Sequence, residues 1–177
     1  MLLIYAVIDQ ERFSEYDAHY FPEESIPITR LSEAKNYSDG SGLRDRTVIC
    51  AELPCSPSDA VWEMTDAELG KLLCDSLAHA GIPIRAPIRE VVTRRLRYAY
   101  PIYRTGYETS FRELDELIGR IGGLLTFGRQ GLFAHDNTHH ALFMAYSAVK
   151  CLCPDGRFDD ACWRESRRTF ESHVVED

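Results

Sequence analysis

The sequence predicts an α+β fold with a mixed or antiparallel sheet and about three packed helices. Two short, largely β-branched or apolar runs, at residues 2–8 and 46–53, indicate buried strands. Three stretches with apolar side chains on one helical face, near residues 65–80, 110–121 and 137–152, indicate helices. Because these elements follow one another without a strict βαβ rhythm, α+β is favoured over a parallel α/β fold.

The expected strands lie mostly in the first half of the chain. Residues 2–8 form a continuous apolar run, and residues 28–37 alternate loosely between apolar and polar side chains. Residues 46–53 form another strand, and a longer one is expected from Glu90 to Tyr103, where Pro101 ends the ladder. Two polar segments rich in Pro, Gly or Ser are expected to be a loop and a turn: residues 9–27 and 38–42.

The helix after Thr65 has the clearest start signal. Thr65 and Glu68 have the spacing of a capping box, in which hydroxyl and carboxylate each bind a backbone N–H, and Gly81 marks the end. In the two later helices the residues expected to face inward are Phe111, Leu114, Leu117, Ile118 and Ile121, then Ala141, Met144, Ala145, Ala148, Val149 and Leu152.

The domain organisation follows from these elements. Residues 1–152 are expected to form a single α+β domain, whose residues 124–152 make a strand, a loop and a helix. Residues 153–177 are charged and are expected to form a tail with a short helix around Trp163.

Composition and charge exclude several classes of partner. The 177 residues are 45% hydrophobic and 27% charged, which is typical of a soluble globular protein, and the net charge is −8. That charge argues against nucleic acid and anionic membranes as partners. The apolar start lacks a basic n-region and is too short to span a membrane, and the six cysteines include no C-x-x-C pair. We therefore expect no membrane span, reduced thiols and a cytoplasmic location.

Catalytic motifs are missing: the sequence has no G-x-S-x-G, no H-E-x-x-H and no Cys with a His nearby in sequence. We therefore name no catalytic residue, and if the protein is an enzyme the reactive atoms would belong to a cofactor. His135 and His139 have the i, i+4 spacing of metal ligands on a helix. Since no third ligand is evident nearby, polar roles at a helix start are favoured and no metal is expected.

The most informative stretch runs from Thr126 to Leu142. A Gly128-Arg129 pair is followed by a short loop, and Asn137 caps a helix with small residues on one face. The amides at such a helix start, together with the helix dipole, make a site for an anion or a carbonyl oxygen.

This stretch resembles the C-terminal cofactor-closing segment of the flavin-containing amine oxidoreductase superfamily, on the branch of UDP-galactopyranose mutase and protoporphyrinogen-oxidase-like proteins. That family has a strand, a Gly-Arg or Gly-Asp pair, a short loop and a helix pointing at the flavin. Weaker similarities follow in the expected order and extend the resemblance over roughly residues 1–152: residues 29–37, 50–54, 99–103, 106–107 and the helix before Gly122-Gly123.

The resemblance implies FAD as cofactor. It places Gly128 and Arg129 along the pyrophosphate and ribityl chain, and Asn137, Thr138 and His139 against the ribityl group and the carbonyl edge of the flavin ring.

On the substrate side the resemblance places Tyr100, Tyr103, Phe133 and His135. Phe133 and His135 stand where the mutases carry two tyrosines that serve the sugar-nucleotide, so the resemblance does not carry that substrate over to this chain.

One family feature is missing. The G-x-G-x-x-G turn that binds the FAD pyrophosphate occurs nowhere in the sequence, which starts inside a predicted core strand. The chain therefore looks like the second half of such a protein, as a truncated frame, a split gene or a remnant would, and is expected to be inactive alone. A separate dinucleotide-binding half or a second copy would be its partner. The alternative is a non-enzymatic α+β module that self-associates or binds a partner through the surface left by the missing dinucleotide half. An exposed apolar strand edge at residues 2–8 would favour such pairing.

Overall fold

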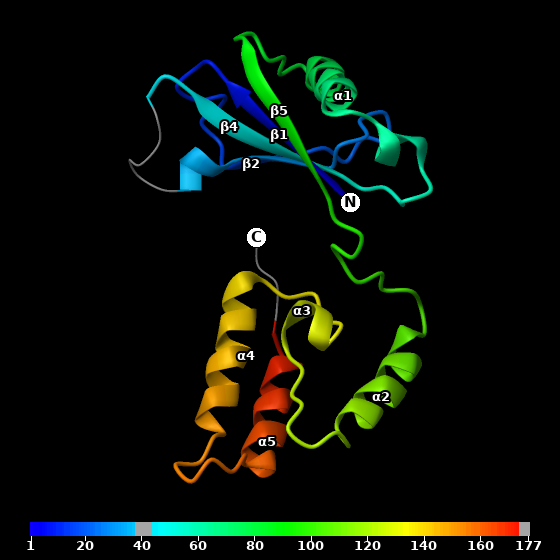
Figure 1. Cartoon of the computed structure of the whole chain (residues 1–177), viewed down its shortest axis with the longest axis vertical. Helices are drawn as coiled ribbons and strands as arrows, with labels where there is room; N and C mark the ends of the chain where they lie inside the picture. Colours follow the sequence, from blue (N-terminus) through cyan, green and yellow to red (C-terminus); the bar gives the residue numbers. More distant parts are fainter. Residues whose placement is uncertain (38–43, 174–177) are drawn as a thin grey trace. The chain divides into compact units, whose positions relative to one another are not determined.

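The computed structural model describes residues 1–37 and 44–173, so the turn expected at residues 38–42 lies outside the described part. The chain divides into two compact units, Met1–Ala99 and Tyr100–Asp177. The first unit contains a sheet and one α-helix, and the second contains helices only (Figure 1). Each unit has its own cluster of buried apolar side chains.

The first unit is built on a five-stranded antiparallel sheet with the order β2-β3-β4-β1-β5. The strands are β1 (Leu2–Ile8), β2 (Ala18–Tyr20), β3 (Arg30–Glu33), β4 (Thr47–Leu53) and β5 (Ile88–Arg95). The expected α+β class with an antiparallel sheet is confirmed. The exposed edge expected at residues 2–8 is wrong, because β1 lies between β4 and β5 and pairs with both along its length.

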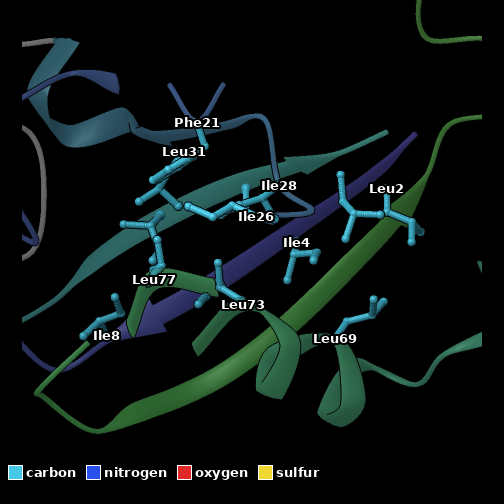
Figure 2. Close-up of a cluster of buried hydrophobic side chains, with 14 residues drawn as sticks. Leu2, Ile4, Ile8, Phe21, Ile26, Ile28, Leu31, Leu69, Leu73 and Leu77 are labelled. Atoms are coloured by element: carbon cyan, nitrogen blue, oxygen red, sulfur yellow. The ribbon is translucent and has the colours of Figure 1, made fainter. Parts of the chain in front are cut away.

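The core of this unit lies between one face of β1 and the helix α1 (Asp66–His79). Alternate residues of β1 are buried, as the period of two along a strand requires. Leu69, Leu73 and Leu77 are fully buried on one face of α1, and Figure 2 shows them directed toward the sheet. Each such side chain contributes about 1.5–3 kcal/mol. The predicted capping box is confirmed, since Glu68 N–H donates to Thr65 Oγ1 at 3.3 Å and Thr65 N–H to Glu68 Oε2 at 2.8 Å.

Three details of this unit differ from the prediction. β2 lies inside the segment expected to be a loop and is only three residues long. The strand expected over 28–37 is shorter, because a 3₁₀ helix, η1 (Ala34–Tyr37), follows β3 directly; a second one, η2 (Ala60–Glu63), precedes α1. β5 ends at Arg95 instead of Tyr103: Leu96 N–H still donates to Met1 O, and the chain after it leaves the sheet.

The second unit contains four helices, so the described residues form five α-helices where about three were expected. They are α2 (Tyr107–Ile118), α3 (Gly128–Gly131), α4 (Thr138–Lys150) and α5 (Asp160–Phe170). Met144 and Cys151 pack with Trp163 and Phe170 in the core, so a helix occupies much of the predicted tail. The strand expected at the start of residues 124–152 is wrong, because the chain turns at Gly128 into the single turn of α3.

Some apolar faces predicted to point inward are exposed. No residue within Tyr107–Ile118 is buried, and Leu114 and Leu117 are 53% and 59% exposed. Val149 on α4 is also 63% exposed. Arg167 of α5 holds α2 by donating two hydrogen bonds to Asp115, both 2.9 Å long. None of the helices formed by residues 1–37 and 44–173 combines the length and apolar character that a membrane crossing requires.

Candidate functional site

All nine residues predicted to contact cofactor or substrate belong to the second unit, in its first forty residues. Five of them, the helix-start group, surround α3 and the beginning of α4: Gly128, Arg129, Asn137, Thr138 and His139. The other four, the aromatic group, are Tyr100, Tyr103, Phe133 and His135. Ring contacts join Tyr103 to Phe133 and His135, and Arg129 lies over the Tyr100 ring, which links the two groups.

Gly128 turns the chain onto α4. Its φ of +80° is a conformation that side-chain-bearing residues rarely adopt. Its N–H donates to Met144 Sδ at 3.1 Å, and a Cβ added here would lie 4.0 Å from the Cβ of Ala141. The positive φ is therefore what requires glycine here, since 4.0 Å is an ordinary van der Waals contact that a Cβ could make.

Arg129 holds the loop that precedes α4 by hydrogen bonds to its backbone. Its Nε donates to the backbone carbonyl oxygen of Asp136 at 2.9 Å, and Nη2 donates to the same oxygen. Its Cζ lies 4.9 Å from the centroid of the Tyr100 ring, within the range of a cation–π contact. Burial raises the pKa of Tyr103, an effect that the positive charge of Arg129 opposes, so the phenol stays protonated at neutral pH.

The start of α4 presents polar groups to solvent. Asn137 is the extended N-cap residue and its N–H donates to His140 Nδ1 at 3.2 Å. Thr138 and His139 are exposed in the first turn, where backbone N–H groups have no partner within the helix and the dipole favours negative charge. Burial lowers the pKa of His140, and the neighbouring His139 and His173 lower it further, so His140 is neutral at pH 7.

The aromatic group gathers around Phe133. The Tyr103 ring lies 5.3 Å from that of Phe133 and 6.3 Å from that of His135. Tyr107 and Phe111 of α2 contact Phe133 with ring centroids 5.0 and 6.2 Å apart, and the sequence analysis assigned neither of them to the site. Their i, i+4 spacing on a helix is a signal that could have found them. Phe133 itself has a φ of 49°, the one positive value among the non-glycine residues that the structure describes.

A different set of histidines comes together than the one the spacing suggested. The structure groups Asp136 with His140 and His173, and Asp136 Oδ1 lies 3.5 Å from the Nδ1 atom of each. The i, i+4 spacing of Asp136 and His140 could have indicated their pairing. His173 follows α5 and no local pattern predicts its arrival.

A hollow of about 1000 Å³ lies elsewhere in this unit. Its walls come from the end of α2, from residues 119–127, and from residues of α4 and α5 that include Trp163. None of the nine predicted residues lines it. The hollow is therefore a separate feature from the predicted flavin contacts.

Comparison with known proteins gives likeness of fold only. No family profile and no curated protein sequence matches the chain. Among solved structures, reduced UDP-galactopyranose mutase superposes with a TM-score of 0.69 at 15% identity, over 99% of this chain and 38% of that one. A protein from Exiguobacterium sp. 255-15 named for protoporphyrinogen oxidase gives a TM-score of 0.55 at 18% identity, over 74% and 30%.

The fold resemblance inferred from the sequence is thereby confirmed for both kinds of protein that it named. The chain spans well under half the length of either structure.

Proposed function

We propose that this chain supplies the substrate-side sheet and the flavin-closing segment of an FAD-dependent oxidoreductase or mutase-like protein. A separate dinucleotide-binding half would supply the remaining FAD contacts, and the isolated chain would not be catalytic. FAD would supply the electron chemistry, and the start of α4 would hold the flavin ring and ribityl chain.

The observation that carries the proposal is the likeness to UDP-galactopyranose mutase over 99% of this chain. Of the residues that the resemblance assigns to flavin, Asn137, Thr138 and His139 form the cap and first turn of α4. Arg129 donates to the Asp136 carbonyl directly before that cap, which supports a shared site. The absence of a G-x-G-x-x-G turn supports the need for a second half.

The side chains present fit flavin better at α4 than at α3. Thr138 and His139 are exposed on the first turn of a 13-residue helix, where a carbonyl oxygen or an anion is stabilised. Arg129 already donates twice to Asp136 O, so its part is to position the helix start more than to bind the pyrophosphate. The aromatic group would face the substrate from the neighbouring surface.

The test is an NMR titration of the isotopically labelled full chain with FMN, FAD and AMP in turn. FMN carries the flavin and ribityl groups without adenosine, and AMP carries adenosine alone. We expect FMN and FAD to shift the amide signals of Gly128, Thr138 and His139, and AMP to leave them unchanged. His139→Ala should weaken the FMN effect, while His79→Ala, in the first unit, should not.

Equal shifts with AMP, or no shift at α4 with millimolar FMN, would refute the flavin assignment. Flavin absorption bands that survive desalting would overturn the requirement for a second half and leave the flavin assignment standing. In that case a second copy of the chain would complete the pocket, and the Arg129→Ala variant should lose the flavin absorption bands.

The alternative, a non-enzymatic module that associates with another protein or with itself, is favoured by one observation. Leu142, Tyr146 and Val149 are 55%, 68% and 63% exposed and lie on one face of α4 by their spacing. If this face mediates self-association, sedimentation velocity will show a dimer that Tyr146→Glu converts to monomer. A monomer at all concentrations would exclude the homodimer.

A further inference from the structure

Three side chains from different parts of the second unit converge beside the start of α4. Asp136 precedes the helix, His140 lies in its first turn and His173 follows α5. Asp136 Oδ1 is 3.5 Å from the Nδ1 atoms of both histidines, and all three ligand atoms lie within 4.8 Å of one another. The side chain of Asp136 is 3% exposed and those of both histidines are 11% exposed.

Two polar atoms of this cluster have no hydrogen-bond partner within residues 1–37 and 44–173. Asp136 Oδ2 and His173 Nδ1 are buried and have no hydrogen-bond partner among the residues that the structure describes. His140 Nδ1 accepts the N–H of Asn137, so this nitrogen carries no proton and cannot donate a hydrogen bond to the carboxylate. Burying a carboxylate among acceptor atoms costs several kcal/mol unless a cation is present.

We propose that Asp136, His140 and His173 bind a divalent first-row transition-metal ion, with at least one further position open to water. In a tetrahedral site with bonds of about 2.0–2.2 Å, neighbouring ligand atoms lie roughly 3.3–3.6 Å apart. The two observed Asp–His separations of 3.5 Å match that spacing. The inference does not depend on flavin binding.

Binding requires a small rearrangement of the rings. The His140 and His173 rings stack with centroids 4.4 Å apart and planes 15° apart, so one ring must rotate for both lone pairs to meet one ion. Rotation about the terminal torsion of His is soft. When the ion binds, His140 Nδ1 coordinates it and no longer accepts the hydrogen bond from the Asn137 N–H.

The ligand set narrows the choice of ion. Two imidazoles with one carboxylate suit Zn²⁺ or Fe²⁺, whereas Mg²⁺ and Ca²⁺ prefer all-oxygen sets. Three protein ligands leave room for water, as in hydrolytic zinc sites and non-haem iron sites.

The experiment uses the full chain, stripped with a chelator and kept reduced, titrated with Co²⁺. We expect visible bands of an N/O-ligated ion without the near-ultraviolet band of cobalt–thiolate bonds. Competition with Zn²⁺, and with Fe²⁺ under anaerobic conditions, ranks the two ions. Asp136→Asn and, separately, His173→Gln should weaken Co²⁺ binding by about 100-fold or more, since even the loss of a neighbour that supports a ligand costs 10–100-fold. His79→Ala and Cys162→Ala are the controls.

Thermal unfolding separates a metal site from a structural ion pair. Zn²⁺ should raise the Tm of the wild-type chain and leave the Tm of Asp136→Asn unchanged. Without metal, the Tm of Asp136→Asn should equal or exceed that of the wild type. Any of three results would overturn the proposal. The first is a cobalt–thiolate band, and the second is Co²⁺ binding that is unchanged in both ligand variants. The third is a metal-free Asp136→Asn variant with a lower Tm than the metal-free wild type at neutral pH.

A separate observation concerns two cysteines that join α4 to α5. Cys151 is the C-cap of α4 and Cys162 lies in the first turn of α5, and their Sγ atoms are 2.6 Å apart. That is well inside van der Waals contact, which is about 3.5–4.0 Å even between carbon atoms, and approaches a disulfide bond of about 2.05 Å. Cys151 is buried, and Cys162 is the more accessible of the two.

We further propose that a small-molecule disulfide such as oxidised glutathione converts this pair to a disulfide. The Cys162 thiolate attacks one glutathione sulfur and releases a glutathione thiolate. Cys151, losing its proton to solvent, attacks Cys162 Sγ and releases the second. One glutathione disulfide is thus reduced to two thiols as the protein's two thiols are oxidised.

Mass spectrometry after incubation with oxidised glutathione and trapping of free thiols tests this step. We expect a single bridge between the peptides that carry residues 151 and 162, lost in Cys162→Ala and kept in Cys153→Ala. A stable glutathione adduct on Cys162, or a bridge that uses Cys153, would overturn it.

Discussion

Arg129 and the backbone carbonyl of Asp136 are joined by two N–H donors of one guanidinium. The contact ties the turn of α3 to the residue just before the cap of α4. It therefore fixes where α4 begins and how its first turn is presented. Arg129 acts on the candidate site as a positioning residue, whatever ligand the helix start receives.

Arg129→Ala should lower the free energy of unfolding of the second unit by about 1–3 kcal/mol, because the Asp136 carbonyl loses both donors. Arg129→Lys should recover only part of the loss, since an ammonium does not reproduce the two-pronged geometry. In a Trp62→Phe background, urea unfolding followed by Trp163 fluorescence measures both. Arg120→Ala, an exposed arginine of the same unit, should change stability by less than about 0.5 kcal/mol. An Arg129→Ala variant as stable as wild type would exclude this role.

Gly70→Ala should destabilise the first unit although alanine is the better helix former. A Cβ at Gly70 would lie 2.9 Å from Val91 Cγ2, where α1 packs on β5. Overpacking costs about 1–3 kcal/mol, against a propensity gain of about 1 kcal/mol. In a Val91→Ala background the clash disappears and the same substitution should become neutral or stabilising. Equal effects in both backgrounds, measured by urea unfolding, would contradict the close contact.

Leu73→Ala should cost roughly 2–5 kcal/mol, because Leu73 is fully buried between α1 and the sheet. The chain has two tryptophans, Trp62 beside this core and Trp163 in the other. In a Trp163→Phe background, fluorescence follows the first unit alone and should show the loss. Leu114→Ala, at a half-exposed position of α2, should leave that transition in place. A small effect at Leu73 would mean that the core is not packed as described.

The elements predicted correctly are those whose signals are local. Residues 2–8 are a continuous apolar run that lies at the centre of the sheet, and the Thr65–Glu68 capping box marks the start of α1 within one residue. Asn137 was also identified correctly as a helix cap. In each case the deciding interactions lie within one strand or one helical turn.

The features that the sequence did not reveal depend on contacts distant along the chain. β2 is a strand because its three residues pair with β3. β1 lies inside the sheet because β5, which follows about 80 residues later, pairs with its second edge. The periodicity of α2 correctly predicted a helix and could not say whether a neighbour covers it. His173 joins Asp136 through the packing of α5 on α4, which no motif records.

Cys151 should make the stability of the reduced protein depend on alkaline pH. Burial raises the pKa of its thiol from 9.0 to about 11, so the folded chain retains a proton that the unfolded chain releases between these values. The free energy of unfolding is therefore unaffected by this group below about pH 9 and falls as the pH rises toward 11. Urea unfolding under reductant at about pH 8 and about pH 10.5 should show a larger loss for wild type than for Cys151→Ala. Cys153→Ala, at a half-buried thiol of the same segment, serves as the control and should keep the wild-type dependence. If Cys151→Ala loses as much stability as wild type over this range, the thiol titrates normally and is not held protonated by the core.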